Sequence, residues 1–268
     1  MIVNTRRLFI RLLSELRINA VCEIGSMNGT DSLNFRAALP EARIYALEPN
    51  PENFRLMSAN SLLRERNIEL VELAATNYDG AADFFLVEAN YSQDTPRRGM
   101  GSLYQRSDPR TPATSVVRVK TVRLDTYLGD KCASGTRMAL WIDAEGKAYE
   151  VIEGLGAAAR HVYLLHIEVE TVPCIATDQK LYADVKALLQ RLGFIELATD
   201  LARSDSQFNS LFVRRTLPAR VQARVAASLM RARMRRVTGG IVGKWCPACV
   251  RRYRQMRLKA VASRARFT

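Results

Sequence analysis

Long apolar runs are missing from this sequence. No stretch approaches the roughly 18 consecutive apolar residues that a membrane-spanning helix needs. The first residues mix arginines with apolar side chains and carry no small-residue cleavage site, so a secretory signal is not expected. We therefore predict a cytoplasmic protein and leave open a peripheral position at the membrane.

Cysteine and histidine are also scarce. The five cysteines are an odd number and are scattered along the chain, which does not fit a disulfide framework. Cys246 and Cys249 have the spacing of a metal or redox pair, but a second such pair is missing. Both histidines, His161 and His166, lie far upstream of this pair. We interpret Cys246 and Cys249 as two ordinary thiols rather than as zinc ligands.

Acidic residues are absent from the last part of the chain. Residues 214–268 contain 16 Lys and Arg and no Asp or Glu, whereas residues 1–213 contain 24 basic and 27 acidic residues. The net charge of +13 therefore belongs to the end of the chain, and the remainder is slightly acidic. We predict a main domain over residues 1–214 and a basic, helical extension over residues 215–268.

The basic extension has apolar residues at helical spacing among its arginines. These apolar residues are Val221, Val225, Leu229 and Ala232. A basic amphipathic helix is typical of segments that bind an anionic membrane surface or a polyanion. Nucleic acid is a weaker candidate, because the few aromatic residues of the extension offer no stacking platform. A solvated helix that docks on an acidic partner is the alternative.

The first strand-to-helix turn lacks the G-x-G-x-x-G pattern of dinucleotide-binding folds. Gly25 and Gly29 are instead four residues apart and follow Glu23, an acid that would repel a phosphate but suit a cationic amino group. Glu48 ends the second apolar run, where a carboxylate can bind two ribose hydroxyls. S-adenosylmethionine has both features. An ordinary strand-to-helix turn is the alternative interpretation.

Short apolar runs alternate with helical patterns along the chain. We predict strands at 20–24, 43–47, 68–73, 81–88, 116–122, 138–142, 163–167, 194–199 and 209–214. We predict helices at 5–17, 30–38, 51–65, 124–128, 146–153 and 178–192. This order predicts an α/β fold with a mostly parallel, doubly wound sheet and an antiparallel C-terminal hairpin. The turn-rich residues 89–115 are predicted to form a partly mobile segment over the active site, with 101–103 best ordered.

Several motifs, in this order, resemble the FkbM family of S-adenosylmethionine-dependent methyltransferases. They lie at 21–29, 47–52, 73–80, 101–103, 122–125, 142–146, 151–154, 192–194 and 209–212. The sequence departs from the family pattern at three places. Within 26–28 the asparagine is shifted by one residue, Trp141 stands where the family often has lysine, and Ala148 stands where it tends to have a glutamate. The resemblance covers about residues 8–214. It implies a Rossmann-like class I methyltransferase sheet, S-adenosylmethionine as cofactor, and methyl transfer to a hydroxyl of a sugar, glycan or related metabolite.

The candidate site residues lie mostly where strands are predicted to end, because ligands of open α/β sheets bind at that edge. The candidate cofactor-binding residues are Glu23, Gly25, Ser26, Asn28, Gly29, Thr30, Glu48, Pro49, Ala74, Ala75 and Ser102. The candidate catalytic residues are Asp143, Glu145, Glu168 and His166, although His166 is more typical of a packed histidine than of a base. The three carboxylates could activate an acceptor hydroxyl themselves or hold Mg²⁺.

A second class of function remains open at this stage. The chain could be a nucleic-acid or membrane-surface binding protein on a methyltransferase-like scaffold without turnover. Binding of S-adenosylmethionine distinguishes the two classes, because only the enzyme needs an intact cofactor pocket. An RNA methyltransferase would predict a basic main domain, whereas residues 1–213 are slightly acidic.

Overall fold

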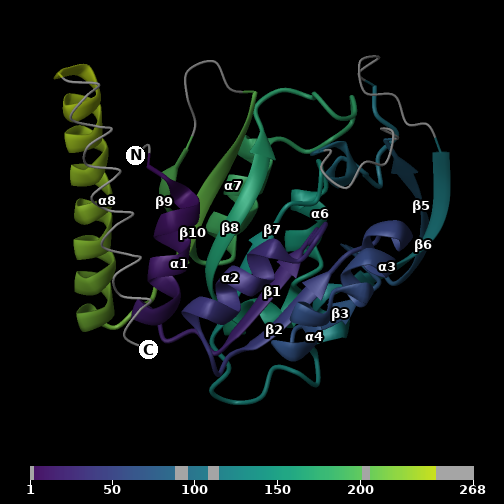
Figure 1. The fold of residues 1–268 in the computed structure, drawn as a ribbon, viewed down its shortest axis with the longest axis horizontal. Helices are drawn as coiled ribbons and strands as arrows, with labels where there is room; N and C mark the ends of the chain where they lie inside the picture. Colours follow the sequence, from purple (N-terminus) through teal and green to yellow (C-terminus); the bar gives the residue numbers. More distant parts are fainter. Residues whose placement is uncertain (1–2, 88–95, 108–114, 201–205, 246–268) are drawn as a thin grey trace.

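Two β-sheets organise the computed structural model, which describes residues 3–87, 96–107, 115–200 and 206–245 (Figure 1). The main sheet has seven strands in the order β3-β2-β1-β7-β8-β10-β9. Its strands are β1 (Ala20–Ile24), β2 (Arg43–Leu47), β3 (Glu69–Val71), β7 (Met138–Ile142), β8 (Val162–Glu170), β9 (Phe194–Thr199) and β10 (Gln207–Arg214). Strands β3, β2, β1, β7 and β8 are parallel, and β10 runs antiparallel between β8 and β9. The predicted fold class is confirmed.

Helices cover both faces of the main sheet. They are α1 (Thr5–Glu15), α2 (Thr30–Ala38), α3 (Pro51–Ala59), α4 (Ser61–Glu65), α5 (Leu124–Leu128), α6 (Ala148–Glu153), α7 (Tyr182–Arg191) and α8 (Ala219–Trp245). One core lies between the sheet and α1, α2 and α8, and a second core lies on the α5, α6 and α7 side. Strands β1 and β7 are buried along their whole length, as continuous apolar runs in a two-sided sheet require.

A smaller sheet stands beside the main one. It has the order β4-β6-β5, with β4 (Ala74–Thr76), β5 (Gly80–Leu86) and β6 (Ser115–Arg123), and lies at the opposite end of the molecule from α8 (Figure 1). Strands β5 and β6 are antiparallel, which agrees with the predicted antiparallel strand after the 77–80 turn. The predicted strand at 68–73 is too long, because the chain leaves the main sheet after Val71 and β4 pairs with β6 instead.

The predicted helix over 51–65 is also corrected. Asn60 has an extended backbone, with φ of −78° and ψ of 105°, and its side chain accepts a hydrogen bond from the Leu62 N–H. An asparagine in this conformation is a strong helix N-cap. The segment therefore forms two helices, α3 and α4, with Asn60 between them.

Helix α8 packs against α1 (Figure 1). Val225 is buried, and Val221, Leu229 and Ala232 pack on the same core as the apolar side of α1. The apolar residues that we expected to face a membrane or a partner therefore contact the protein's own core, which corrects that interpretation for 221–232. None of the described helices is long and apolar enough to span a membrane. Cys246, Cys249 and the rest of 246–268 lie outside the described residues.

Candidate active site

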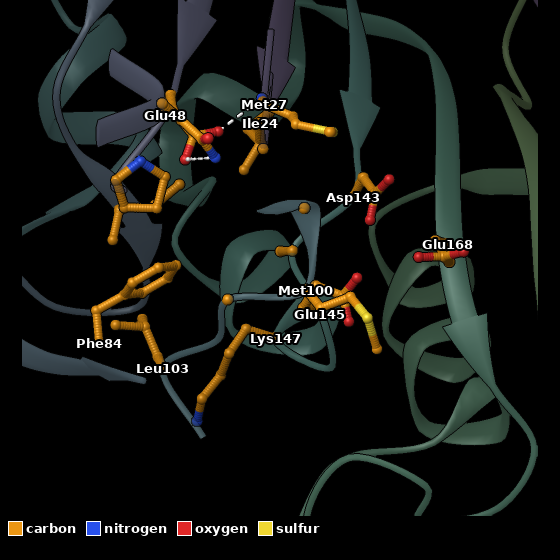
Figure 2. Close-up of a pocket in the computed structure, with 18 of the residues that line it drawn as sticks. Ile24, Met27, Glu48, Phe84, Met100, Leu103, Asp143, Glu145, Lys147 and Glu168 are labelled. Carbon is orange, nitrogen blue, oxygen red and sulfur yellow. Dashed lines mark hydrogen bonds between the residues drawn. The ribbon is translucent and has the colours of Figure 1, made fainter. Parts of the chain in front are cut away.

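A cavity of about 400 Å³ opens at the carboxyl ends of β1, β2, β7 and β8 (Figure 2). Parallel strands bring residues distant in sequence to this one edge, which is where open α/β sheets bind ligands. Five predicted cofactor-binding residues line the cavity: Gly25, Glu48, Pro49, Ala74 and Ala75. Three predicted catalytic residues line it as well: Asp143, Glu145 and Glu168. Residues 98–107, which we call the strap, form part of its wall.

Glu48 follows β2 directly and is held by three hydrogen bonds. Its Oε2 accepts from the Met27 N–H at 2.6 Å, and its Oε1 accepts from the Asn50 N–H at 2.9 Å and from Asn53 Nδ2 at 3.3 Å. Burial raises the pKa of Glu48 to about 7, and these hydrogen bonds oppose the shift. A carboxylate has about four acceptor sites, so Glu48 keeps acceptor capacity toward the cavity.

The turn after β1 brings two backbone segments very close together. Gly25 has a φ of 82°, and a Cβ atom at this position would lie 1.9 Å from the Asp143 carbonyl oxygen. Met27 also has a positive φ, of 51°, and it lines the cavity although sequence reasoning missed it. The other predicted residues of this turn do not line the cavity; these are Ser26, Asn28, Gly29 and Thr30. Gly25 is therefore required for the fold of the cavity floor.

Glu23 lies below the cavity rather than in its wall. Its side chain is 2% exposed and accepts a hydrogen bond from the Ser32 hydroxyl. Burial raises the pKa of Glu23 to about 8, so the group is mainly protonated at neutral pH. We had expected Glu23 to bind the amino group of the cofactor, and its position corrects this assignment. Glu23 lies two residues before Gly25, so its side chain stands in the row of Trp141, one layer below the cavity.

The position of Glu23 predicts a pH-dependent stability. Its pKa is near 4.5 in an unfolded chain and about 8 in the fold, so its contribution to stability is complete below pH 4.5 and is lost as the pH rises through 8. Glu23→Gln keeps the acceptor for Ser32 without the ionisation. We expect Glu23→Gln to raise the free energy of unfolding by about 2 to 4 kcal/mol at pH 8 and much less at pH 5. Urea titrations at both pH values measure this, with the exposed Glu52→Gln as control, and an equal effect at both would contradict it.

His166 lies within a strand, as predicted, but away from the cavity. It pairs with Trp141 of β7 in the sheet, stacks on its ring at a centroid distance of 3.7 Å, and hydrogen-bonds the Thr5 hydroxyl of α1 at 3.0 Å. Burial lowers the pKa of His166 to about 3. His166 does not line the cavity, which agrees with the packed histidine favoured from the sequence and not with the alternative of a catalytic base. It is a neutral, packed histidine.

The polar end of the cavity holds an acidic cluster of Asp143, Glu145 and Glu168. Carboxylate oxygens of the three residues lie within 4.8 Å of one another (Figure 2). The carboxyl groups of Asp143 and Glu168 lie close enough together for the pair to hold one proton near neutral pH. Burial and the negative charge of Asp143 raise the pKa of Glu168 far above its usual range. Together, Asp143 and Glu168 can accept or release a proton beside the cavity.

Glu145 reaches the same cluster from a strained turn after β7. Its φ is 45°, a left-handed conformation that is uncommon for residues other than glycine. The Ser102 hydroxyl donates to the Glu145 carbonyl at 2.7 Å, which places Ser102 behind the site rather than against a cofactor. The Glu145 carboxylate forms an ion pair with Arg106 of the strap. Sequence reasoning missed Arg106, because the turn-rich segment around it gives no periodic signal.

The opposite end of the cavity is apolar. Leu73, Ala74, Ala75, Phe84 and Leu103 line it. A flat aromatic ligand fits such a surface, because contact with apolar side chains removes its faces from water. Glu48 stands at the border between the apolar and polar ends (Figure 2).

The strap is fixed to the molecule at several points. Phe85 and Ser102 exchange two backbone hydrogen bonds of 2.8 and 3.1 Å, and the Ser107 N–H donates to the Ile175 carbonyl at 2.8 Å. Arg98 donates to Asn53 Oδ1 at 2.7 Å, and Asn53 in turn contacts Glu48. The expectation that 101–103 is ordered agrees with these contacts. The flanking residues 88–95 and 108–114 lie outside the described part.

Comparison with protein families gives one match. The description "Methyltransferase FkbM domain" matches residues 23–196, a range that includes both ends of the cavity. No curated protein matches this sequence.

Several solved structures resemble this fold at low sequence identity. The FkbM methyltransferase from Methylobacillus flagellatus KT is 11% identical with a TM-score of 0.46, and the match covers 73% of this chain and 43% of that chain. The precorrin-6y C5,15-methyltransferase from Geobacter metallireducens GS-15 is 15% identical with a TM-score of 0.41, covering 77% and 86%. The N-terminal domain of EvdMO1, solved in the presence of SAH and D-fucose, is 15% identical with a TM-score of 0.43, covering 80% and 82%.

Proposed function

Because the chain belongs to the FkbM family of S-adenosylmethionine-dependent methyltransferases, we propose that it transfers a methyl group to a hydroxyl of a sugar, glycan or related metabolite. One observation carries this proposal. A single cavity joins Glu48, beside an apolar surface, to the neighbouring carboxyl groups of Asp143 and Glu168. The first end suits an adenosine and the second suits an alcohol that must lose a proton.

The residues at the first end fit S-adenosylmethionine. The adenine ring would lie on the apolar surface of Ala74, Ala75 and Phe84, and the Glu48 carboxylate would accept hydrogen bonds from the two ribose hydroxyls. Gly25 has no side chain to block the cavity floor between Glu48 and Asp143. The bound cofactor supplies a methyl group activated by its positive sulfur.

The residues at the second end fit a polyhydroxylated acceptor. Asp143, Glu145 and Glu168 offer hydrogen-bond acceptors, while the Gln207 amide adds a donor to the same wall. Hydroxyl groups both donate and accept, so a sugar can satisfy such a mixed surface, whereas an apolar acceptor would leave the buried polar groups unpaired.

The proposed reaction is an in-line displacement. The acceptor oxygen forms a bond to the methyl carbon while the bond from that carbon to sulfur breaks, and the electron pair of the broken bond stays on sulfur. The proton of the acceptor hydroxyl passes to the Asp143 carboxylate, which lies beside Glu168 in the acidic cluster. The chain thereby supplies position and proton removal, which are the main requirements of this chemistry.

Methyl transfer to a panel of acceptors tests the proposal. The full chain is incubated with methyl-labelled S-adenosylmethionine and neutral hexoses, deoxyhexoses, uronic acids and a short oligosaccharide, with a catechol as a flat aromatic comparison. Label is expected in an alkali-stable methyl ether of a hydroxylated acceptor. Absence of cofactor binding by calorimetry would reject the enzymatic function altogether, whereas label on the catechol, or only in an alkali-labile ester of the uronic acids, would reject the proposed acceptor class.

A further inference from the structure

The acidic cluster has the oxygen atoms of a metal site, but part of its negative charge is already neutralised by an arginine. Its three carboxylates could supply the oxygen ligands that Mg²⁺ prefers. However, one of the three, Glu145, is already ion-paired with the Arg106 guanidinium. A divalent ion at the cluster would have to compete with this fixed positive charge.

Arg106 is held firmly in this position. Its side chain is only 5% exposed, and its Nε and Nη2 also donate to the Met100 carbonyl at 2.9 and 2.8 Å. Displacing the guanidinium would break these hydrogen bonds and leave a buried charge without its partner. Removing one partner of a buried ion pair is strongly unfavourable, because it leaves the other charge buried and uncompensated.

Both partners of the ion pair are also fixed through their backbones. The Glu145 carbonyl accepts from the Ser102 hydroxyl, and Ser102 is bonded to Phe85 of β5. The Ser107 N–H, directly after Arg106, donates to the Ile175 carbonyl. The cation therefore belongs to the same rigid arrangement that forms the cavity wall.

We infer that the Arg106 guanidinium is the resident cation of the acidic cluster and occupies the place that a divalent metal ion would take. The guanidinium neutralises Glu145, and the proton shared by Asp143 and Glu168 neutralises a second carboxylate, so one negative charge remains. The Mg²⁺ expected as an option from the sequence does not fit this site. The inference rests on the proposed function only in making Arg106 a positioning residue for a metal-independent methyl transfer.

Manganese binding tests this inference without any turnover. Calorimetry measures Mn²⁺ binding to each full-length protein and to the same protein carrying Asp143→Asn. The difference between the two is the binding that depends on Asp143. We expect no such Asp143-dependent binding in the natural chain. In Arg106→Ala, which removes the cation and leaves room, the affinity is expected to rise at least about tenfold.

Two matched variants separate charge from packing. Arg106→Lys keeps the positive charge and is expected to show no gain in Mn²⁺ affinity. Arg98→Ala removes the other described arginine that lines the cavity from the strap, one that contacts Asn53 rather than an acid, and is also expected to show no gain. Asp143-dependent binding in the natural chain, or its absence in a folded Arg106→Ala, would overturn the inference.

The natural chain alone keeps the inference testable if Arg106→Ala does not fold. Labelled methyl transfer is then measured with EDTA and with added Mg²⁺. Unchanged rates in both conditions are expected, whereas a loss with EDTA that Mg²⁺ restores would overturn the inference. Failure of the proposed function would appear differently. The chain would not bind S-adenosylmethionine, while Mn²⁺ would still bind Arg106→Ala and not the natural chain.

Discussion

Glu48→Ala is expected to weaken S-adenosylmethionine binding by about 100-fold or more. Glu48 would accept hydrogen bonds from both ribose hydroxyls, and a hydrogen bond to a charged group contributes about 1.5 to 3 kcal/mol. Losing two such bonds corresponds to this change in Kd. Calorimetry at pH 8 measures it, because burial raises the pKa of Glu48 to about 7 and the carboxylate is ionised above that pH.

The same pKa predicts how the natural chain responds to pH. Protonation of Glu48 removes acceptor capacity, so the affinity for the cofactor should fall as the pH drops below 7. The N–H groups of Met27 and Asn50 donate to the Glu48 carboxylate. Glu48→Gln keeps the size of this side chain, so it controls for a loss of packing around them. The control is Glu52→Ala, an acid in the first turn of α3 whose side chain is 40% exposed. Equal affinity for Glu48→Ala and Glu52→Ala would contradict the assignment.

The strands that carry the cavity could be predicted almost residue by residue. The apolar runs at 20–24, 43–47 and 138–142 are too short for helices, and they coincide with β1, β2 and β7. Glu48 and Asp143 come directly after two of them. Because parallel strands place their carboxyl ends at one edge, the sequence was sufficient to bring these two acids to one cavity.

The C-terminal end of β8 could not be predicted in the same way. We expected β8 to end at Ile167, but it continues to Glu170. His166 pairs with Trp141, so it lies beside β7 instead of beyond its end. A one-residue change along a strand moves a side chain to the opposite face, and a two-residue change moves it to another layer. Glu23 and His166 are therefore one layer below the Asp143 and Glu168 that line the cavity.

Arg106 and the pairing of β4 with β6 could not be predicted from sequence patterns for another reason. The strap has no apolar periodicity, and its position depends on contacts with Phe85, Glu145 and Ile175, which are distant in sequence. Pairing of β4 with β6 is likewise a long-range contact between short strands. Such contacts depend on how the whole chain packs, and no local pattern encodes them.

Asp143→Asn is expected to lower the rate of methyl transfer by about 100-fold to 10,000-fold, while the Kd for S-adenosylmethionine changes by less than about threefold. Proton removal by a positioned side chain contributes rate factors of this size. Asparagine has nearly the same shape as aspartate, and the Asp143 backbone N–H still donates to the Ile24 carbonyl, so the cavity should persist. Single-turnover transfer to the acceptor found in the panel measures the effect.

A double-mutant cycle distinguishes a proton-sharing pair from two independent acids. Asp143 and Glu168 act through one proton, so Asp143→Asn/Glu168→Gln should be about as slow as the slower single variant. Independent roles would instead multiply the two losses. Asp83→Asn, which breaks the exposed ion pair between Asp83 of β5 and Arg118 of β6, is the matched control and should retain the natural rate. A rate for Asp143→Asn within threefold of that control would show that the base lies elsewhere, because a group that removes the proton in the transition state cannot be neutralised at so small a cost.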